Sequence, residues 1–274
     1  MTSPVKDGIR RAAKAGFAVA DLMFTPWPGP RLLIYHQVGA GNGRQMDLDP
    51  ATFRRQVEWL DSNGRIVDLE TALEGADEPG ASESYVITVD DGYEDFYDNA
   101  FPLLREKGAP FTLYLTTSHI ETGSPLKAGD RPLNWDQVGE MLETGLVTLG
   151  AHTHTHPDLR GISVSEVEEE VGLSNEIIAR RTGCQPRHFA YPKGYWDQAA
   201  EGPIRRHYET ATLGSAGPVT GRTDRHRIPR VPVQLSDGYF LFTRRVRRGL
   251  RLEEGLRRRL RGYHPPPTDS AKGG

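Results

Sequence analysis

The sequence predicts one α/β domain whose parallel sheet is rolled into a barrel. From residue 31 onward, short apolar runs rich in strand formers alternate with helix-type segments. This alternation is typical of strand–helix–strand units with parallel strands. About seven such units follow one another without a change of composition before residue 240. The number of units favours a barrel-like domain, although periodicity alone leaves an open sheet as the alternative.

Composition and charge limit the class of protein. The 274 residues are 36% hydrophobic and 26% charged, which predicts a soluble globular chain. The formal net charge of −3 indicates no nucleic acid or other polyanion as a partner of the whole protein. Cys184 is the single cysteine, so nothing here requires an oxidising compartment. Without a clear signal peptide or a bilayer-length apolar run, we expect a cytoplasmic or membrane-peripheral location.

The chain divides into three parts. Residues 1–30 form a basic, amphipathic segment, and residues 31–240 form the α/β domain. The tail, 241–274, is Arg-rich and compatible with a helix up to Gly262, then Pro-rich and expected to be disordered. The tail is interpreted as a solvated helix lying on the body. The alternative is a peripheral docking surface for anionic lipid.

The individual elements follow from local patterns. Strands are expected at 31–36, 64–69, 85–89, 110–117, 146–152, 188–192, 210–215 and 227–233. Helices are expected at 49–64, 99–108, 134–145, 163–183 and 197–208, and a surface loop at 72–84.

Capping residues mark where several of these helices begin. Asp49 can cap the first helix, and Pro50 suits its first position. Asn134 is the expected cap of the helix that starts there. Ser163 and Glu166, three residues apart, form a capping box before an apolar periodic run.

Two polar clusters lie where strands are expected to end. "YVITVDDG" ends an apolar run in Asp90 and Asp91, and "LGAHTHTH" places His152 and His156 after another strand. In parallel α/β folds the carboxyl ends of the strands meet at the functional rim. Two imidazoles and one carboxylate suit a divalent ion, and the second carboxylate stays free to move protons. The structural alternatives are an ordinary Asp-Gly turn and a coincidental pair of histidines. His154, between the pair, is interpreted as a packing residue or as one that supports the ligands from behind.

These motifs resemble a known family. "TVDDGYEDFYDNAFPLLREKGAPFTLYL" and "WDQVGEMLETGLVTLGAHTHTHPDL" are similar to the first two signature regions of the polysaccharide deacetylases, carbohydrate esterase family 4. "LLIYHQVG" and "DPATFRRQVEWL" resemble one bacterial branch that includes deacetylases of poly-N-acetylglucosamine. The similarity runs from about residue 31 to 235. It implies a distorted (β/α) barrel of about seven units and a divalent metal, usually zinc.

The resemblance also implies roles for single residues. Asp90 resembles the general base, and Thr153 the small hydroxyl residue that shapes the loop after the first histidine. The three residues that resemble the metal ligands are Asp91, His152 and His156.

The third motif of the family has a partial counterpart. "FAYPKG" resembles the segment that forms one wall of the substrate groove. Tyr191, Pro192 and Lys193 are therefore expected to bind substrate, and the backbone N–H of Lys193 to hold the developing oxyanion. Many members have an Arg that orients the base where this chain has Ala190. We expect Arg230, in "RIPRV", to replace it.

The late histidine that supplies the general acid in many members has no clear counterpart. His36, at a strand end, is the expected substitute, while His226 is interpreted as structural. The resulting hypothesis is a metal-dependent hydrolase that removes N-acetyl groups from an N-acetylated sugar or glycan by metal-activated water. Three alternatives remain open: hydrolysis of another C–N bond as in purine-degradation relatives, a non-haem iron oxygenase with a 2-His-1-carboxylate site, and a non-catalytic glycan-binding module.

Overall fold

The computed structural model describes residues 16, 17, 19, 23 and 25–261. Much of the predicted segment 1–30, and the end of the tail from residue 262, therefore lie outside the described residues. No helix within the described part of the chain has the length and apolarity to cross a membrane.

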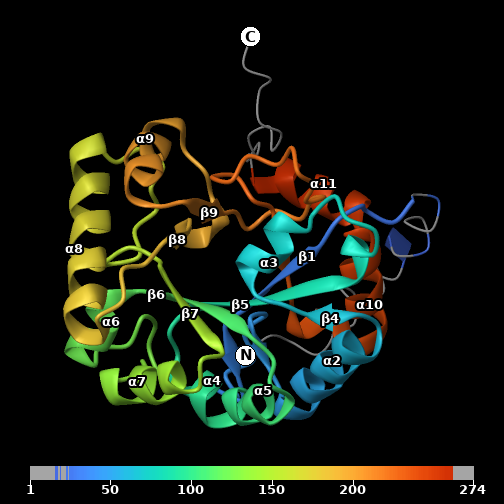
Figure 1. Ribbon diagram of the computed structural model, residues 1–274, viewed down its shortest axis with the longest axis horizontal. Coiled ribbons are helices and arrows are strands. Elements are labelled where there is room, and N and C mark those ends of the chain that lie inside the picture. The colour runs from blue at the N-terminus through green and yellow to red at the C-terminus, as the bar shows by residue number, and fades with distance from the viewer. Residues whose placement is uncertain (1–15, 18, 20–22, 24, 262–274) are drawn as a thin grey trace.

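A sheet of eight parallel strands forms the centre of the molecule (Figure 1). Its strands are β1 (Arg31–Tyr35), β4 (Arg65–Ile66), β5 (Ser84–Asp91), β6 (Phe111–Leu115), β7 (Val147–Ala151), β8 (His188–Ala190), β9 (Thr210–Thr212) and β10 (Val231–Pro232). The order is β10-β1-β5-β6-β7-β8-β9, and β4 pairs with the start of β5. Two short strands, β2 (Gln37–Val38) and β3 (Asp47–Leu48), pair apart from this sheet.

The segment 228–232 brings the two ends of the sheet together. Ile228 forms a parallel bridge with Thr212 of β9, and Val231 pairs with Leu33 of β1. Strand β9, at one end of the sheet order, is thus connected to β1, near the other end, through this short stretch of chain. The sheet is the distorted parallel barrel that the sequence predicts, and Arg230 lies in the stretch that closes it.

Helices surround the sheet. They are α2 (Pro50–Ser62), α3 (Leu69–Glu74), α4 (Glu94–Asn99), α5 (Phe101–Lys107), α6 (Thr117–Thr122), α7 (Trp135–Glu143), α8 (Val164–Thr182), α9 (Gln198–His207), α10 (Gly238–Arg248) and α11 (Arg251–Arg261). Short 3₁₀ turns lie at Ala81–Glu83, Pro192–Gly194 and Leu235–Asp237. The caps predicted at Asp49, Asn134 and Ser163 are confirmed, the last two as full capping boxes.

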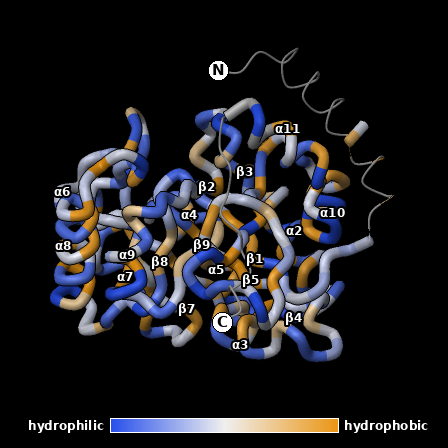
Figure 2. The backbone as a smooth tube through the Cα atoms, turned by 90° about the horizontal axis from the view of Figure 1, so that it is seen from above, coloured by the Kyte–Doolittle hydropathy of each residue, from blue (hydrophilic) through white to orange (hydrophobic). Residues whose placement is uncertain are grey.

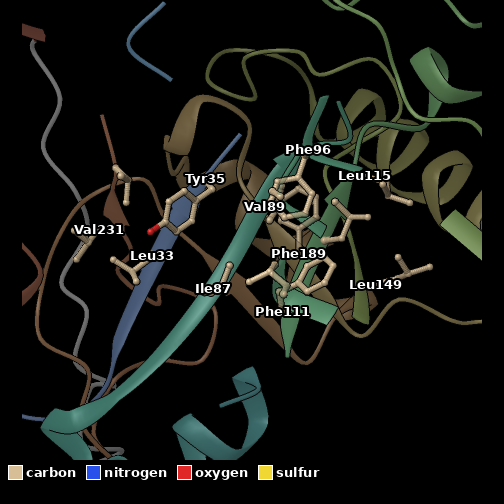
Figure 3. Close-up of a cluster of buried hydrophobic side chains, with 14 of the residues drawn as sticks. Leu33, Tyr35, Ile87, Val89, Phe96, Phe111, Leu115, Leu149, Phe189 and Val231 are labelled. Carbon is tan, nitrogen blue, oxygen red and sulfur yellow. The ribbon is translucent and has the colours of Figure 1, made fainter. Parts of the chain in front are cut away.

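The alternation of side chains along β5 separates two environments. Ile87 and Val89 belong to the large apolar cluster between the strands and the helices, drawn in Figure 3. Val86 belongs instead to a smaller cluster with Leu32 and Leu69 of α3. In Figure 2, apolar residues are concentrated on the central strands, inside a mostly polar outer layer. Because neighbours on a strand point to opposite faces, Thr88 and Asp90 follow Val86 to the face turned away from the large cluster.

One local prediction was wrong in part. The expected surface loop 72–84 contains the end of α3 and a 3₁₀ turn, because Asp68 caps α3 through the backbone N–H of Thr71 and Ala72 is buried. The start of the tail is helical and lies on the body, since Phe242 and Val246 of α10 are buried. Phe242 packs edge-to-face on Trp59 of α2.

Candidate metal and catalytic site

The two adjacent aspartates end β5, and the backbone turns sharply there. Consecutive residues of a strand normally point to opposite faces. Asp91 instead has φ = 78°, in the left-handed region, and Gly92 follows with φ = 87°. Left-handed backbone is uncommon for residues with a Cβ and is concentrated at functional sites. This turn brings both carboxylates to the same cavity.

The structure brings Asp91 together with both predicted histidines. The ligand atoms of Asp91, His152 and His156 all lie within 4.8 Å of one another. The Nε2 atom of each imidazole is 3.4 Å from Oδ1 of Asp91. That oxygen is buried and has no hydrogen-bond partner. A buried, unpartnered carboxylate oxygen facing two imidazole nitrogens fits a divalent cation.

Hydrogen bonds to the backbone orient the two histidines. Nδ1 of His152 lies 2.7 Å from the carbonyl oxygen of Ala190, so this nitrogen carries the proton and Nε2 keeps its lone pair. The backbone N–H of His156 donates to Oγ1 of Thr153 at 3.0 Å. Thr153 and His156 both have positive φ, 67° and 60°. The hydroxyl of Thr153 therefore supports a tight turn, as the resemblance implies.

Glu170 of α8 holds the other side of this turn, and no sequence pattern predicts this role. Its carboxylate accepts from the backbone N–H groups of His154 and Thr155 at 2.9 and 2.8 Å, and from the hydroxyl of Thr155 at 2.6 Å. His154 points elsewhere, with Nδ1 2.9 Å from Oγ1 of Thr117. Nothing local marks Glu170 among the neighbouring glutamates, because only the tertiary contact distinguishes it.

Asp90 is held by Arg230 in a two-pronged ion pair. Nη1 and Nη2 of Arg230 donate to Oδ1 and Oδ2 of Asp90 at 2.6 and 2.8 Å. Arg230 is fully buried and also donates to Oγ1 of Thr88 and the carbonyl of Leu213. Its guanidinium lies 5.2 Å from the centre of the Tyr114 ring. The arginine thus fixes the carboxylate in one orientation.

Burial and charge act in opposite directions on the acidic groups. Burial raises the pKa of Asp90, but the charge of Arg230 outweighs it and the pKa lies below its ordinary value. Burial likewise opposes ionisation of Asp91, but the nearby rings of His152, His36 and His156 outweigh it and hold its pKa below the ordinary value. Both aspartates are therefore carboxylates at neutral pH. Burial, together with His152, lowers the pKa of His156 to about 4, which leaves a neutral imidazole suited to bind metal.

A cavity of about 640 Å³ opens onto these groups. Its wall includes His36, Tyr93, Lys193 and the polar side chain of Gln37, besides the aspartates and the two histidines. Nδ1 of His36 is buried without a hydrogen-bond partner, and burial lowers the pKa of this ring. Tyr93, directly after the Asp-Asp-Gly turn, was not singled out in the sequence. Such a cavity is of the size that small-molecule and sugar sites have.

Only part of the predicted third motif reaches the cavity. Lys193 lines it, with φ = 59°, but Tyr191 is fully buried in the large apolar cluster and Pro192 is also buried. Direct substrate contact by Tyr191 and Pro192 is therefore not supported by their placement, because they lie behind the wall that Lys193 faces. His226 lies outside the cavity wall, with Nε2 2.8 Å from the carbonyl of Tyr208.

Comparison with known proteins gives the same family as the motifs. The polysaccharide deacetylase family model matches residues 77–207. YxkH of Bacillus subtilis, whose name assigns it to this family, is 27% identical over 216 residues, covering 76% of this chain and 74% of YxkH. The poly-beta-1,6-N-acetyl-D-glucosamine N-deacetylase of Staphylococcus epidermidis is 28% identical and covers 66% of each chain. A 31% identical match to the Escherichia coli K12 enzyme of the same name spans only 21% of that protein.

Solved structures show the same fold. IcaB from Ammonifex degensii superposes with a TM-score of 0.69 at 23% identity, covering 80% of this chain and 96% of IcaB. BC0361, a polysaccharide deacetylase from Bacillus cereus, also gives 0.69, at 22% identity, covering 81% of this chain and 70% of BC0361. The segment 77–207, which contains the motifs at the ends of β5 and β7, thus matches the polysaccharide deacetylase family model, and about three quarters of the chain is similar to a relative named as a polysaccharide deacetylase.

Proposed function

We propose that this protein is a metal-dependent N-deacetylase of an N-acetylated sugar or polysaccharide. One observation carries the proposal: a buried Asp-His-His group lies beside a second carboxylate that an arginine holds at the same cavity. Asp91, His152 and His156 would hold the ion, and zinc suits two imidazoles and a carboxylate best. When bound, the ion would supply Lewis-acid polarisation of the acetamide and activation of water near neutral pH.

The remaining residues divide the proton transfers between them. Asp90 is ionised and fixed by Arg230, so it can take the proton of the attacking water. Lys193 lies on the cavity wall, and its backbone N–H would donate a hydrogen bond to the substrate carbonyl oxygen as that oxygen becomes negative. Cleavage of the C–N bond also needs a proton on the leaving amine. His36 is our candidate for that role, and since its ring is neutral in the free protein, it must first receive the proton that it gives.

Acetate release tests this proposal. The metal-loaded protein is incubated with N-acetylglucosamine oligomers in β-1,4 and β-1,6 linkage, and acetate is measured. We expect release by the wild type and a fall of about 10²- to 10⁴-fold in Asp90→Asn. Asp90→Asn keeps the size of the side chain and the three candidate ligands, so its metal content serves as the control. Absence of acetate from every oligomer, despite bound metal, would count against deacetylation and direct attention to other C–N substrates.

A further inference from the structure

Helix α11 exposes the side chains that a surface helix normally buries. Leu252 and Leu256 are 42% and 45% exposed, whereas Glu253 and Glu254 are only 6% and 8% exposed. Residues four apart lie on one face of a helix, so the two leucines form an outward apolar stripe. The cause lies beneath the helix: Glu253 accepts from the fully buried Arg245 of α10 at 2.6 Å. The ion pair fixes the acidic side inward and turns the leucines to the surface.

The same two helices concentrate positive charge. Gly238–Arg261 contains nine arginines and two glutamates, in a chain whose formal net charge is −3. Both glutamates are buried, while Arg247 and Arg259 are exposed. Arg259 is three residues beyond Leu256 and therefore lies on the same side of α11. The outer surface of this region is thus cationic and apolar at once.

Exposed aromatic residues extend this surface onto α10. Tyr239 and Phe240, in the first turn of α10, are 49% and 56% exposed. Helices α10 and α11 follow each other directly and lie together at one end of the molecule in both views (Figures 1 and 2). We call the exposed residues of these helices the terminal face, which comprises Tyr239, Phe240, Arg247, Leu252, Leu256 and Arg259.

We infer that the terminal face binds the surface of an anionic phospholipid bilayer. Arginines neutralise acidic headgroups, while leucine, tyrosine and phenylalanine enter the boundary between headgroups and acyl chains. A polyanion without an apolar phase would satisfy the arginines but leave the leucines in water. An apolar protein partner would instead have to cover the arginines. The combination of charge and apolar side chains therefore matches a lipid surface.

The position of α11 links this face to the cavity. Glu253, on the inner side of α11, contributes to the cavity wall, and the leucine stripe lies on the outer side of the same helix. A bilayer on the terminal face would therefore lie one helix away from the candidate catalytic groups. If the proposed deacetylation is also correct, the substrate would be an N-acetylated sugar presented at a membrane surface, for example one attached to a lipid.

Sedimentation with vesicles tests the inference on the full chain. Phosphatidylcholine vesicles are compared with vesicles in which one quarter of the lipid is phosphatidylglycerol. We expect binding only to the anionic vesicles, and weaker binding as the salt concentration rises. Leu252→Ser with Leu256→Ser should weaken binding at least tenfold, because two half-exposed leucines lose their burial in lipid. Arg259→Gln should weaken it about fivefold.

A matched variant controls for general effects of removing an exposed apolar side chain. Val164 at the start of α8 is 47% exposed and outside the terminal face, so Val164→Ser should bind as the wild type does. Thermal unfolding of the double leucine variant should be unchanged, since its side chains are already exposed. Equal binding to both lipid compositions, or full binding by the double variant, would overturn the inference. It would also be overturned if the wild type bound no vesicles and eluted as a dimer that the double variant converts to monomers.

Acetate release from soluble oligomers separates this inference from the proposed function. The double leucine variant should retain wild-type turnover on soluble substrate, because Leu252 and Leu256 face away from the cavity wall. Failure of the wild type in that assay and with an N-acetylglucosamine-bearing lipid in the anionic vesicles would reject deacetylation and leave the vesicle-binding result standing.

Discussion

Two fully buried arginines illustrate how similar ion pairs serve different purposes in this protein. Arg230 binds both oxygens of one carboxylate, Asp90. Arg245 binds two carboxylates, Asp237 at 3.0 Å and Glu253 at 2.6 Å. Asp90 is also part of the cavity wall, whereas Asp237 is buried and Arg245 joins α10 to α11. A buried arginine alone therefore does not identify a functional site. Glu253 lines the cavity as well, but Asp90 is the partner that lies next to the candidate metal ligand Asp91.

The largest expected effect is on catalysis. Arg230→Ala leaves Asp90 without its partner, so kcat should fall about a hundredfold or more while KM changes little. Arg230→Lys should restore part of kcat, since it returns a charge but loses the two-pronged geometry. Steady-state kinetics on metal-loaded protein measures both. Unchanged turnover in Arg230→Ala would reject the positioning role.

The corresponding change at the second arginine should affect stability instead. Arg245→Met removes the buried guanidinium that both Asp237 and Glu253 bind, which costs about 3–5 kcal/mol. For a chain of this size the midpoint of thermal unfolding should fall by roughly 10 °C. The kcat of the protein that remains folded should stay near the wild-type value. A large loss of kcat without loss of stability would show that the two arginines do not differ as described.

A smaller effect is expected at the turn between the two histidines. Glu170→Gln weakens the acceptor for two backbone N–H groups, so metal affinity should fall about 10- to 100-fold. Calorimetric titration with Zn²⁺ measures this change. Glu169→Gln is the matched control, because Glu169 is exposed and adjacent. Equal affinity in both variants would mean that the turn keeps its shape without Glu170.

The smallest effect on stability is expected at Asp95, a carboxylate whose hydrogen-bond donors differ from those of Asp90 and Asp237. Amide groups of Gln37 and Val38 hold it in place of an arginine, and burial raises its pKa to about 6. The ionised form of Asp95 is therefore disfavoured in the folded protein. Protonated Asp95 contributes to the free energy of unfolding at low pH, and this contribution is lost as the pH rises through about 6.

Replacing this group isolates its contribution. Asp95→Asn should be more stable than the wild type at pH 7.5, by about 1 kcal/mol or 2–4 °C, and should lose that advantage near pH 4. Thermal melts at both pH values check the sign. A variant that is less stable at pH 7.5 would contradict it.

The same contrasts explain which features the sequence could predict. The strands, the capped helices and the position of Asp90, Asp91, His152 and His156 at strand ends depend on local patterns, and the structure has them there. The sequence also pointed to Arg230, through a family position occupied here by Ala190, and the structure pairs it with Asp90.

Other features depend on contacts between distant segments. Glu170 acts on a turn that precedes it by some fifteen residues, and no local pattern separates it from its neighbours. Tyr191 was expected at the substrate groove because of its motif, but the packing of β8 against the helices buries it. The sequence does not distinguish Arg245 from the other arginines of the tail, because its two carboxylate partners, Asp237 and Glu253, are apparent only in the folded structure.

The proposed mechanism requires that Asp91, His152 and His156 bind one divalent ion while Asp90 does not. Elemental analysis of purified wild type, Asp91→Ala, His152→Ala and Asp90→Asn tests it most directly. We expect about one zinc per chain in the wild type and in Asp90→Asn, and near-complete loss in the other two. Metal retained in both Asp91→Ala and His152→Ala, or lost in Asp90→Asn alone, would contradict it.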